Sequence, residues 1–169
     1  MKTERGGFRP MQHEQLLQEL VHDSYKAGHK LPELTRCPDC GAVFSGGRWK
    51  RGALPENGSK AGVHEERCPA CHRIRDKFPA GYVTLKGPFF TEHREEVLAR
   101  VRHCEQAEKS RHVLERIMAI EANSEGSLVT TTDTHLARRI GEALHNAFKG
   151  QVDYQYNKED NLLRVTWTR

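Results

Sequence analysis

Four cysteines arranged as two Cys-x-x-Cys pairs are the residues of this chain best suited to chemistry. The pairs are Cys37/Cys40 and Cys68/Cys71, and 27 residues separate them. Two residues between cysteines allow one tight turn to point both sulfurs at a single ion, and two such knuckles complete a tetrahedral shell. Gly41 follows the first pair and tolerates the left-handed backbone that closes such a turn. We therefore expect one structural zinc ion bound by Cys37, Cys40, Cys68 and Cys71.

Disulfide bonds and iron are the alternatives to zinc for these sulfurs. The N-terminal residues include no apolar stretch that would serve as a signal peptide, which predicts a cytoplasmic protein in which disulfides rarely persist. Iron in a rubredoxin-like electron carrier uses the same cysteine spacing, but the segments around these cysteines are basic rather than acidic. Zinc is therefore the favoured ion and iron its main competitor. The fifth cysteine, Cys104, shares a helical face with Val97, Leu98 and Val101, so we expect it in the core.

The positive charge of the chain is concentrated around the cysteine pairs. The whole sequence of 169 residues has a formal net charge of +4. Residues 26–77 contain 11 Lys and Arg against 6 Asp and Glu, whereas residues 78–169 contain 13 of each sign. Positively charged loops attract the phosphate groups of nucleic acids. This distribution predicts that the cysteine-containing segment contacts RNA.

A short aromatic and basic run is the leading candidate for that contact. In the glycine-rich segment 46–52, Trp49 stands between cations, where its indole ring can stack on a base while Arg and Lys contact phosphates. The alternative is that Trp49 packs over the metal site and that the cations are merely solvated. The full set of candidate RNA-binding residues is Arg48, Trp49, Lys50, Arg51, Arg67, Arg73, Arg75, Lys77, Arg138 and Arg139.

Three segments are expected to position these groups. The composition of residues 1–30 indicates a polar leader followed by a short amphipathic helix from Met11 to about Tyr25. Residues 31–80 are expected to form the zinc-knuckle module, with an exposed loop at 53–62 between its two halves. Residues 81–169 are expected to form an α/β domain.

Hydrophobic periodicity in the α/β domain predicts two helices and five strands. One helix is expected at 91–109, and another between Asp133 and Gly150, where Leu136, Ile140 and Leu144 repeat at intervals of four. The strands are expected at 82–85, 113–121, 127–132, 152–156 and 162–168. The expected fold class is α+β: a small four-cysteine zinc module followed by a ferredoxin-like βαββαβ domain with an extra C-terminal strand.

Three runs of residues also resemble a known family. They are the run from Cys68 to Asp76, the run from Gly81 to Gly87 and the run from Asp133 to Ile140. With the double knuckle, they make residues 35–169 similar to the nonsense-mediated mRNA decay protein three family, the archaeal and eukaryotic adaptors of the large ribosomal subunit, and to its small bacterial relatives. This resemblance implies a zinc-bearing fold that binds ribosomal RNA or a ribosomal subunit, with the large subunit favoured.

Familiar catalytic motifs do not accompany these features. The sequence contains no phosphate-binding Gly-x-x-x-x-Gly-Lys loop, no Gly-x-Ser-x-Gly elbow and no His-Glu-x-x-His helix. We therefore expect a non-catalytic, zinc-containing RNA-binding protein without a membrane span or a small-molecule substrate. The alternatives are a rubredoxin-like electron carrier and a zinc-stabilised regulatory module that binds other proteins.

Overall fold

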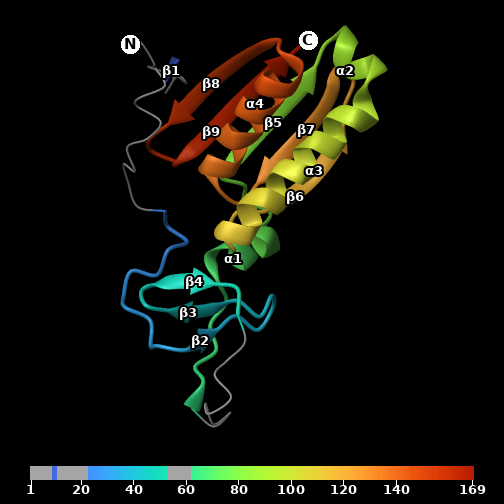
Figure 1. Cartoon of the computed structure of the whole chain (residues 1–169). Helices are drawn as coiled ribbons and strands as arrows, with labels where there is room; N and C mark the ends of the chain where they lie inside the picture. The colour runs from blue at the N-terminus through green and yellow to red at the C-terminus, as the bar shows by residue number, and fades with distance from the viewer. Residues whose placement is uncertain (1–8, 11–22, 53–61) are drawn as a thin grey trace, which may run out of the picture.

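Two β-sheets, one small and one large, organise the chain in a computed structural model that describes residues 9–10, 23–52 and 62–169 (Figure 1). The expected helix falls mostly on residues 11–22 and the expected loop mostly on 53–61, so both lie largely outside the described residues. Residues 23–26 form a turn, in which the Lys26 amide donates to the carbonyl of Asp23 at 2.9 Å.

The small sheet carries the first knuckle and has the order β2-β3-β4. Its strands β2 (Thr35–Arg36), β3 (Val43–Ser45) and β4 (Arg48–Lys50) are antiparallel neighbours. Gly46 and Gly47, with φ of 60° and 79°, make the turn between β3 and β4, because a tight hairpin turn of this kind needs two left-handed residues. The glycine-rich segment 46–52 therefore contains the turn and the second strand of a β-hairpin.

The second knuckle is joined to the small sheet through the backbone. The Arg36 amide donates to the carbonyl of His64 at 2.8 Å, and the Glu66 amide donates to the carbonyl of Arg36 at 3.1 Å. Helix α1 (Pro69–Asp76) follows, with Cys68 at its N-cap and proline at its start, a position where proline fits well. These bonds bring the two halves of the cysteine motif together.

The large sheet has six strands in the order β1-β8-β9-β5-β7-β6. Helices α2, α3 and α4 pack on one face of this sheet (Figure 1). The strands are β1 (Arg9–Pro10), β5 (Gly81–Lys86), β6 (Ile117–Ala122), β7 (Gly126–Thr131), β8 (Gln151–Asn157) and β9 (Leu162–Thr168). The helices are α2 (Pro88–Glu92), α3 (Arg94–Arg111) and α4 (Thr134–Phe148).

The last strand, β9, lies inside the sheet, whereas the sequence predicted an extra C-terminal strand added to a ferredoxin-like domain. A ferredoxin-like order would place the fourth strand of the domain, β8, beside the first, β5; instead β9 pairs with β5 in parallel and β8 lies outside it. The side chains explain this choice. Strand β9 buries Leu163, Val165 and Trp167, whereas β8 exposes Gln151 and Gln155, and a strand with polar side chains is better placed towards an edge.

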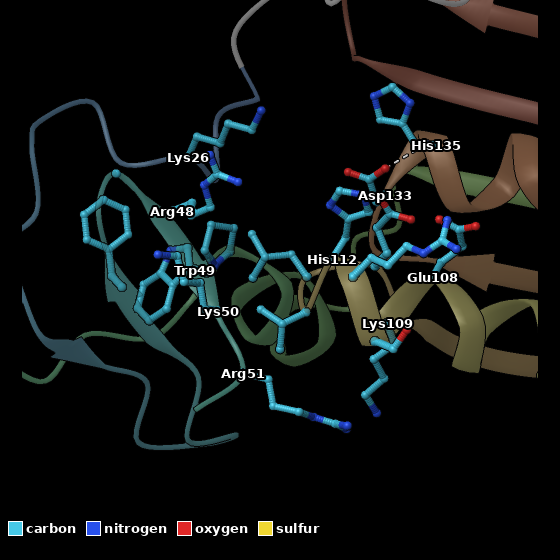
Figure 2. Close-up of a pocket in the computed structure, with 18 of the residues that line it drawn as sticks. Lys26, Arg48, Trp49, Lys50, Arg51, Glu108, Lys109, His112, Asp133 and His135 are labelled. Atoms are coloured by element: carbon cyan, nitrogen blue, oxygen red, sulfur yellow. Dashed lines mark hydrogen bonds between the residues drawn. The ribbon is translucent and has the colours of Figure 1, made fainter. Parts of the chain in front are cut away.

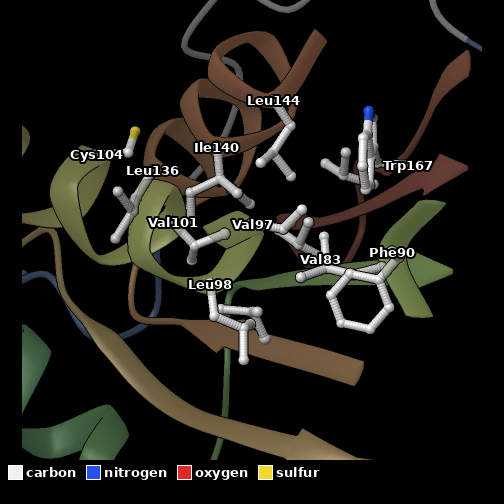
Figure 3. Close-up of a cluster of buried hydrophobic side chains, with 14 of the residues drawn as sticks. Val83, Phe90, Val97, Leu98, Val101, Cys104, Leu136, Ile140, Leu144 and Trp167 are labelled. Atoms are coloured by element: carbon white, nitrogen blue, oxygen red, sulfur yellow. The ribbon is translucent and has the colours of Figure 1, made fainter. Parts of the chain in front are cut away.

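The core forms where the two long helices meet the sheet (Figure 3). Leu136, Ile140 and Leu144 of α4 are fully buried, which confirms the expected apolar stripe. Asp133 caps this helix by accepting a hydrogen bond from the His135 amide at 2.7 Å. Cys104 is buried in the same core, as expected, and burial raises the pKa of its thiol to about 11. No helix in the described part of the chain is long and apolar enough to cross a membrane.

Candidate metal centre and the cationic cleft beside it

The four cysteines of the two knuckles converge on one point. Their sulfurs all lie within 4.8 Å of one another, and Cys40 Sγ is 3.8 Å from Cys68 Sγ. Four sulfurs bound at about 2.3 Å to one zinc ion stand about 3.8 Å apart in a regular tetrahedron. The cluster of Cys37, Cys40, Cys68 and Cys71 therefore fits a single tetrahedral ion, and this fit holds for any metal with a similar bond length to sulfur.

Backbone amides around the cluster point at the sulfurs. The Cys68 amide lies 3.3 Å from Cys37 Sγ, and the Cys71 amide lies 3.5 Å from Cys68 Sγ. Such N–H···S contacts spread the negative charge that four thiolates would share with a divalent ion. Cys37, Cys68 and Cys71 are buried, whereas Cys40 is exposed at the edge of the cluster. A closed shell of four protein ligands is typical of a structural metal site.

Arg116, which directly precedes β6, caps the same cluster from the α/β domain. Its Nη2 atom lies 3.2 Å from Cys40 Sγ and 3.5 Å from Cys68 Sγ, and its Nη1 atom lies 3.4 Å from Cys71 Sγ. A second anchor, from Nε to the carbonyl of Val113 at 2.9 Å, fixes the guanidinium group. The side chain is 9% exposed, so its positive charge is buried against the thiolates. Arg116 would thus offset part of the negative charge of the four thiolates if they bound a metal ion.

The electrostatics of the metal-free cluster follow from this contact. Burial opposes ionisation of Cys40, but hydrogen bonds from the Ala42 amide and from Arg116 lower the pKa of this thiol to about 7. Burial raises the pKa of Cys68, and it raises the pKa of Cys71 against the lowering effect of Arg116. The protein therefore favours a thiolate at Cys40 over one at Cys68 or Cys71, and a metal ion would displace the protons of these two thiols.

A cleft of about 900 Å³ lies between the small module and the α/β domain. In Figure 2, Arg48, Trp49 and Lys50 form one wall, and Glu108 and His112 belong to the opposite wall. Eight of its lining residues are Lys or Arg and three are Asp or Glu. The cleft is therefore predominantly cationic, and its acidic groups are confined to the wall of the α/β domain.

Six of the ten candidate RNA-binding residues line this cleft. Arg48, Lys50 and Arg51 are exposed, and Trp49 is half-buried with its ring edge-on to Phe44 at 5.7 Å between centroids. The indole ring lines the cleft and also packs against the buried cluster that contains Cys37, Cys68 and Cys71, so the alternative of packing at the metal site holds for part of the ring. From the other wall come Arg139, which is half exposed, and Arg138, which is buried and donates to Glu142 at 3.1 Å.

The remaining four candidates surround the second knuckle and have different environments. Arg75 and Lys77 are exposed but do not line the cleft. Arg67 is engaged by the carboxylate of Asp39, which links the two knuckles, and this contact lowers the pKa of Asp39. Arg67 therefore has a structural contact within the module.

Arg73 is not part of any exposed surface, contrary to the sequence-based expectation. It is 2% exposed, its Nη2 atom lies 2.7 Å from Asp23 Oδ1, and its Nη1 atom donates to the carbonyl of Phe78 at 3.1 Å. Its guanidinium also lies over the ring of Tyr25 at 4.4 Å. Arg73 fastens residues 23–25 to the end of α1, and we withdraw it from the candidate RNA contacts.

Residues 112–116 carry functional groups that sequence reasoning missed. The expected strand began at residue 113, but β6 begins at Ile117, and the preceding turn directs Arg116 to the sulfurs. In the same turn, burial and the nearby carboxylates of Asp133 and Glu108 raise the pKa of Glu115 to about 8. No local pattern marks Arg116, because it lies 45 positions after the nearest cysteine that it contacts, Cys71.

Comparison with known proteins adds nothing to the geometry described above. No family model matches the chain, and no curated protein or solved structure matches it.

Proposed function

We propose that the protein is a non-catalytic, zinc-containing RNA-binding protein that acts on the ribosome, with the large subunit as the favoured partner. The observation that carries the proposal is the wall of the cleft formed by the β3–β4 hairpin. Arg48, Lys50 and Arg51 are exposed there and form no ion pair among the described residues. Exposed cations of this kind are available for phosphate groups.

The aromatic ring between these cations supports RNA as the partner. Trp49 lines the cleft and is braced by Phe44. A half-buried indole held at a cleft wall can stack on an unpaired base, and stacking contributes about 1–3 kcal/mol per base. Cations and a stacking ring within one run of four residues suit single-stranded RNA.

The metal centre supports this surface from beneath. The same knuckle segment that supplies Cys37 and Cys40 continues into the β3–β4 hairpin, so a bound ion would hold the hairpin in place. We propose zinc for this centre because the surrounding residues are basic and because the resemblance noted in the sequence implies a zinc-bearing fold. A visible absorption band of an iron tetrathiolate in the purified protein would overturn the assignment and favour an electron carrier.

Two double variants with the same change in net charge test the use of the cleft. One replaces Arg48 and Lys50 by Glu, and the control replaces by Glu Arg102 and Lys158, which are exposed outside the cleft and are not candidate RNA contacts. Affinity for a fluorescent single-stranded RNA is measured by anisotropy at several salt concentrations, using protein that retains one equivalent of metal. We expect the cleft variant to bind far more weakly and with a flatter salt dependence, by about 0.7 in the log–log slope per lost phosphate contact.

Equal losses in the two variants would mean that net charge, and not the cleft, governs binding. Trp49→Ala should weaken binding by about 1–3 kcal/mol with little change in the salt slope. If the parent protein has no salt-sensitive affinity for RNA, the proposal fails, and a zinc-stabilised module that binds other proteins becomes the better account.

A further inference from the structure

The wall of the cleft opposite the hairpin carries a second group of metal-binding side chains. Glu108, near the end of α3, and His112, its C-terminal cap, are four residues apart and therefore lie on the same side of the helix. The chain then turns back, with the Glu115 amide donating to the carbonyl of His112 at 3.0 Å. As a result, ligand atoms of Glu108, His112 and Glu115 all lie within 4.8 Å of one another.

The carboxylate of Glu115 is a second, independent observation that points to a cation at this cluster. Glu115 is 8% exposed, and its Oε2 atom is buried without a hydrogen-bond partner among the described residues. An unpartnered buried carboxylate oxygen is costly, because it loses water and gains nothing in return. The adjacent Arg116 does not help, since its guanidinium group is directed to the cysteine sulfurs.

The other charged groups near this cluster leave room for a cation. Arg139 Nε lies 3.9 Å from Glu108 Oε1, at the outer limit of an ion pair, and its Nη1 lies 3.5 Å from Glu142. Arg138 is engaged by Glu142, and Asp133 accepts the amide hydrogen of His135. Neither arginine forms an ion pair with Glu115 among the described residues.

We propose that Glu108, His112 and Glu115 bind one divalent cation whose remaining coordination positions face the cleft. Two carboxylates and one imidazole form a donor set that suits Mn²⁺, Fe²⁺ and Zn²⁺, whereas the four thiolates select soft ions. Ligands bound at about 2.0–2.2 Å on opposite sides of an ion stand about 4.2 Å apart. A small rotation of the side chains therefore brings the three groups into coordinating positions. This site does not depend on the proposed binding of RNA.

Manganese is the probe that separates this site from the cysteine cluster, because Mn²⁺ prefers oxygen and nitrogen to sulfur ligands. Protein with one equivalent of zinc is titrated with Mn²⁺, and electron paramagnetic resonance measures the free ion. We expect one Mn²⁺ per chain, and at least a tenfold loss of affinity in Glu115→Gln and in His112→Gln. Glu96→Gln is the matched control on the same helix, because Glu96 belongs to an exposed pair in which His93 Nδ1 lies 3.4 Å from its Oε2.

Binding that is absent in the parent protein, or equally strong in Glu115→Gln, overturns the proposal. A measurement on the unaltered protein keeps it testable if the variants fail to fold. Mn²⁺ at substoichiometric amounts should selectively broaden the imidazole signals of His112 in nuclear magnetic resonance spectra. Broadening centred on His93 instead would place the ion on the surface and likewise overturn the proposal.

Discussion

Replacing Arg116 by Met tests whether the α/β domain supports the metal centre. Met retains an unbranched apolar stem but removes the N–H groups that lie 3.2 to 3.5 Å from the sulfurs of Cys40, Cys68 and Cys71. Loss of groups that hydrogen-bond metal ligands typically weakens metal affinity 10–100-fold. That range corresponds to about 1.4–2.7 kcal/mol of binding free energy. We expect a loss within this range, because three sulfurs lose a charged donor together.

The assay is competition for zinc against a chromophoric chelator, with Arg138→Met as the matched control. Arg138 is also a buried arginine of the α/β domain, 8% exposed, but its partner is Glu142 and not a sulfur. The control should keep zinc affinity within about threefold of the parent protein, below one kcal/mol. Arg116→Lys should give an intermediate loss, because it keeps the charge but not the planar fork. If Arg116→Met binds zinc as tightly as the control does, Arg116 does not support the centre.

Three further perturbations test the module, the core and the sheet. Cys37→Ser should abolish stoichiometric zinc binding and the protease resistance of the small module, because metal binding and folding are coupled there. A full equivalent of tightly bound zinc in this variant would show that the other three cysteines suffice. Leu144→Ala should lower the free energy of unfolding by about 2–5 kcal/mol, since the side chain is fully buried, and an unchanged melting temperature would be inconsistent with that packing. Gly126→Ala should destabilise the sheet, because a Cβ there would clash with the carbonyl oxygen of Leu85. Chemical denaturation measures the change, and a variant as stable as the parent would mean that β5 and β7 approach less closely.

The elements that the sequence predicted well are those whose signal is local. The helix capped by Asp133 has apolar residues at regular intervals, and the structure buries them at a single interface. The cysteine pairs were equally clear, because the chemistry of a metal shell fixes their spacing. The turn at Gly46 and Gly47 also has a local signal, two glycines between β-forming residues, but no strand was predicted on either side of it.

The features that were missed depend on contacts between distant parts of the chain. The insertion of β9 beside β5 is set by parallel pairing between residues about 80 apart, which no local pattern encodes. The burial of Arg73 depends on Asp23 and Tyr25, and the role of Arg116 depends on cysteines far earlier in the sequence. Cations are usually exposed, so charge counting assigned Arg73 to the surface.

Sedimentation with purified large ribosomal subunits is the most direct test of the proposed function. Protein that carries one equivalent of zinc is mixed with subunits and centrifuged through a sucrose gradient at low and at high salt. The account predicts that the protein sediments with the subunit at low salt, is released at high salt, and stays at the top of the gradient when Arg48 and Lys50 are replaced by Glu. A folded, zinc-loaded parent protein that remains at the top of the gradient at low salt would contradict it.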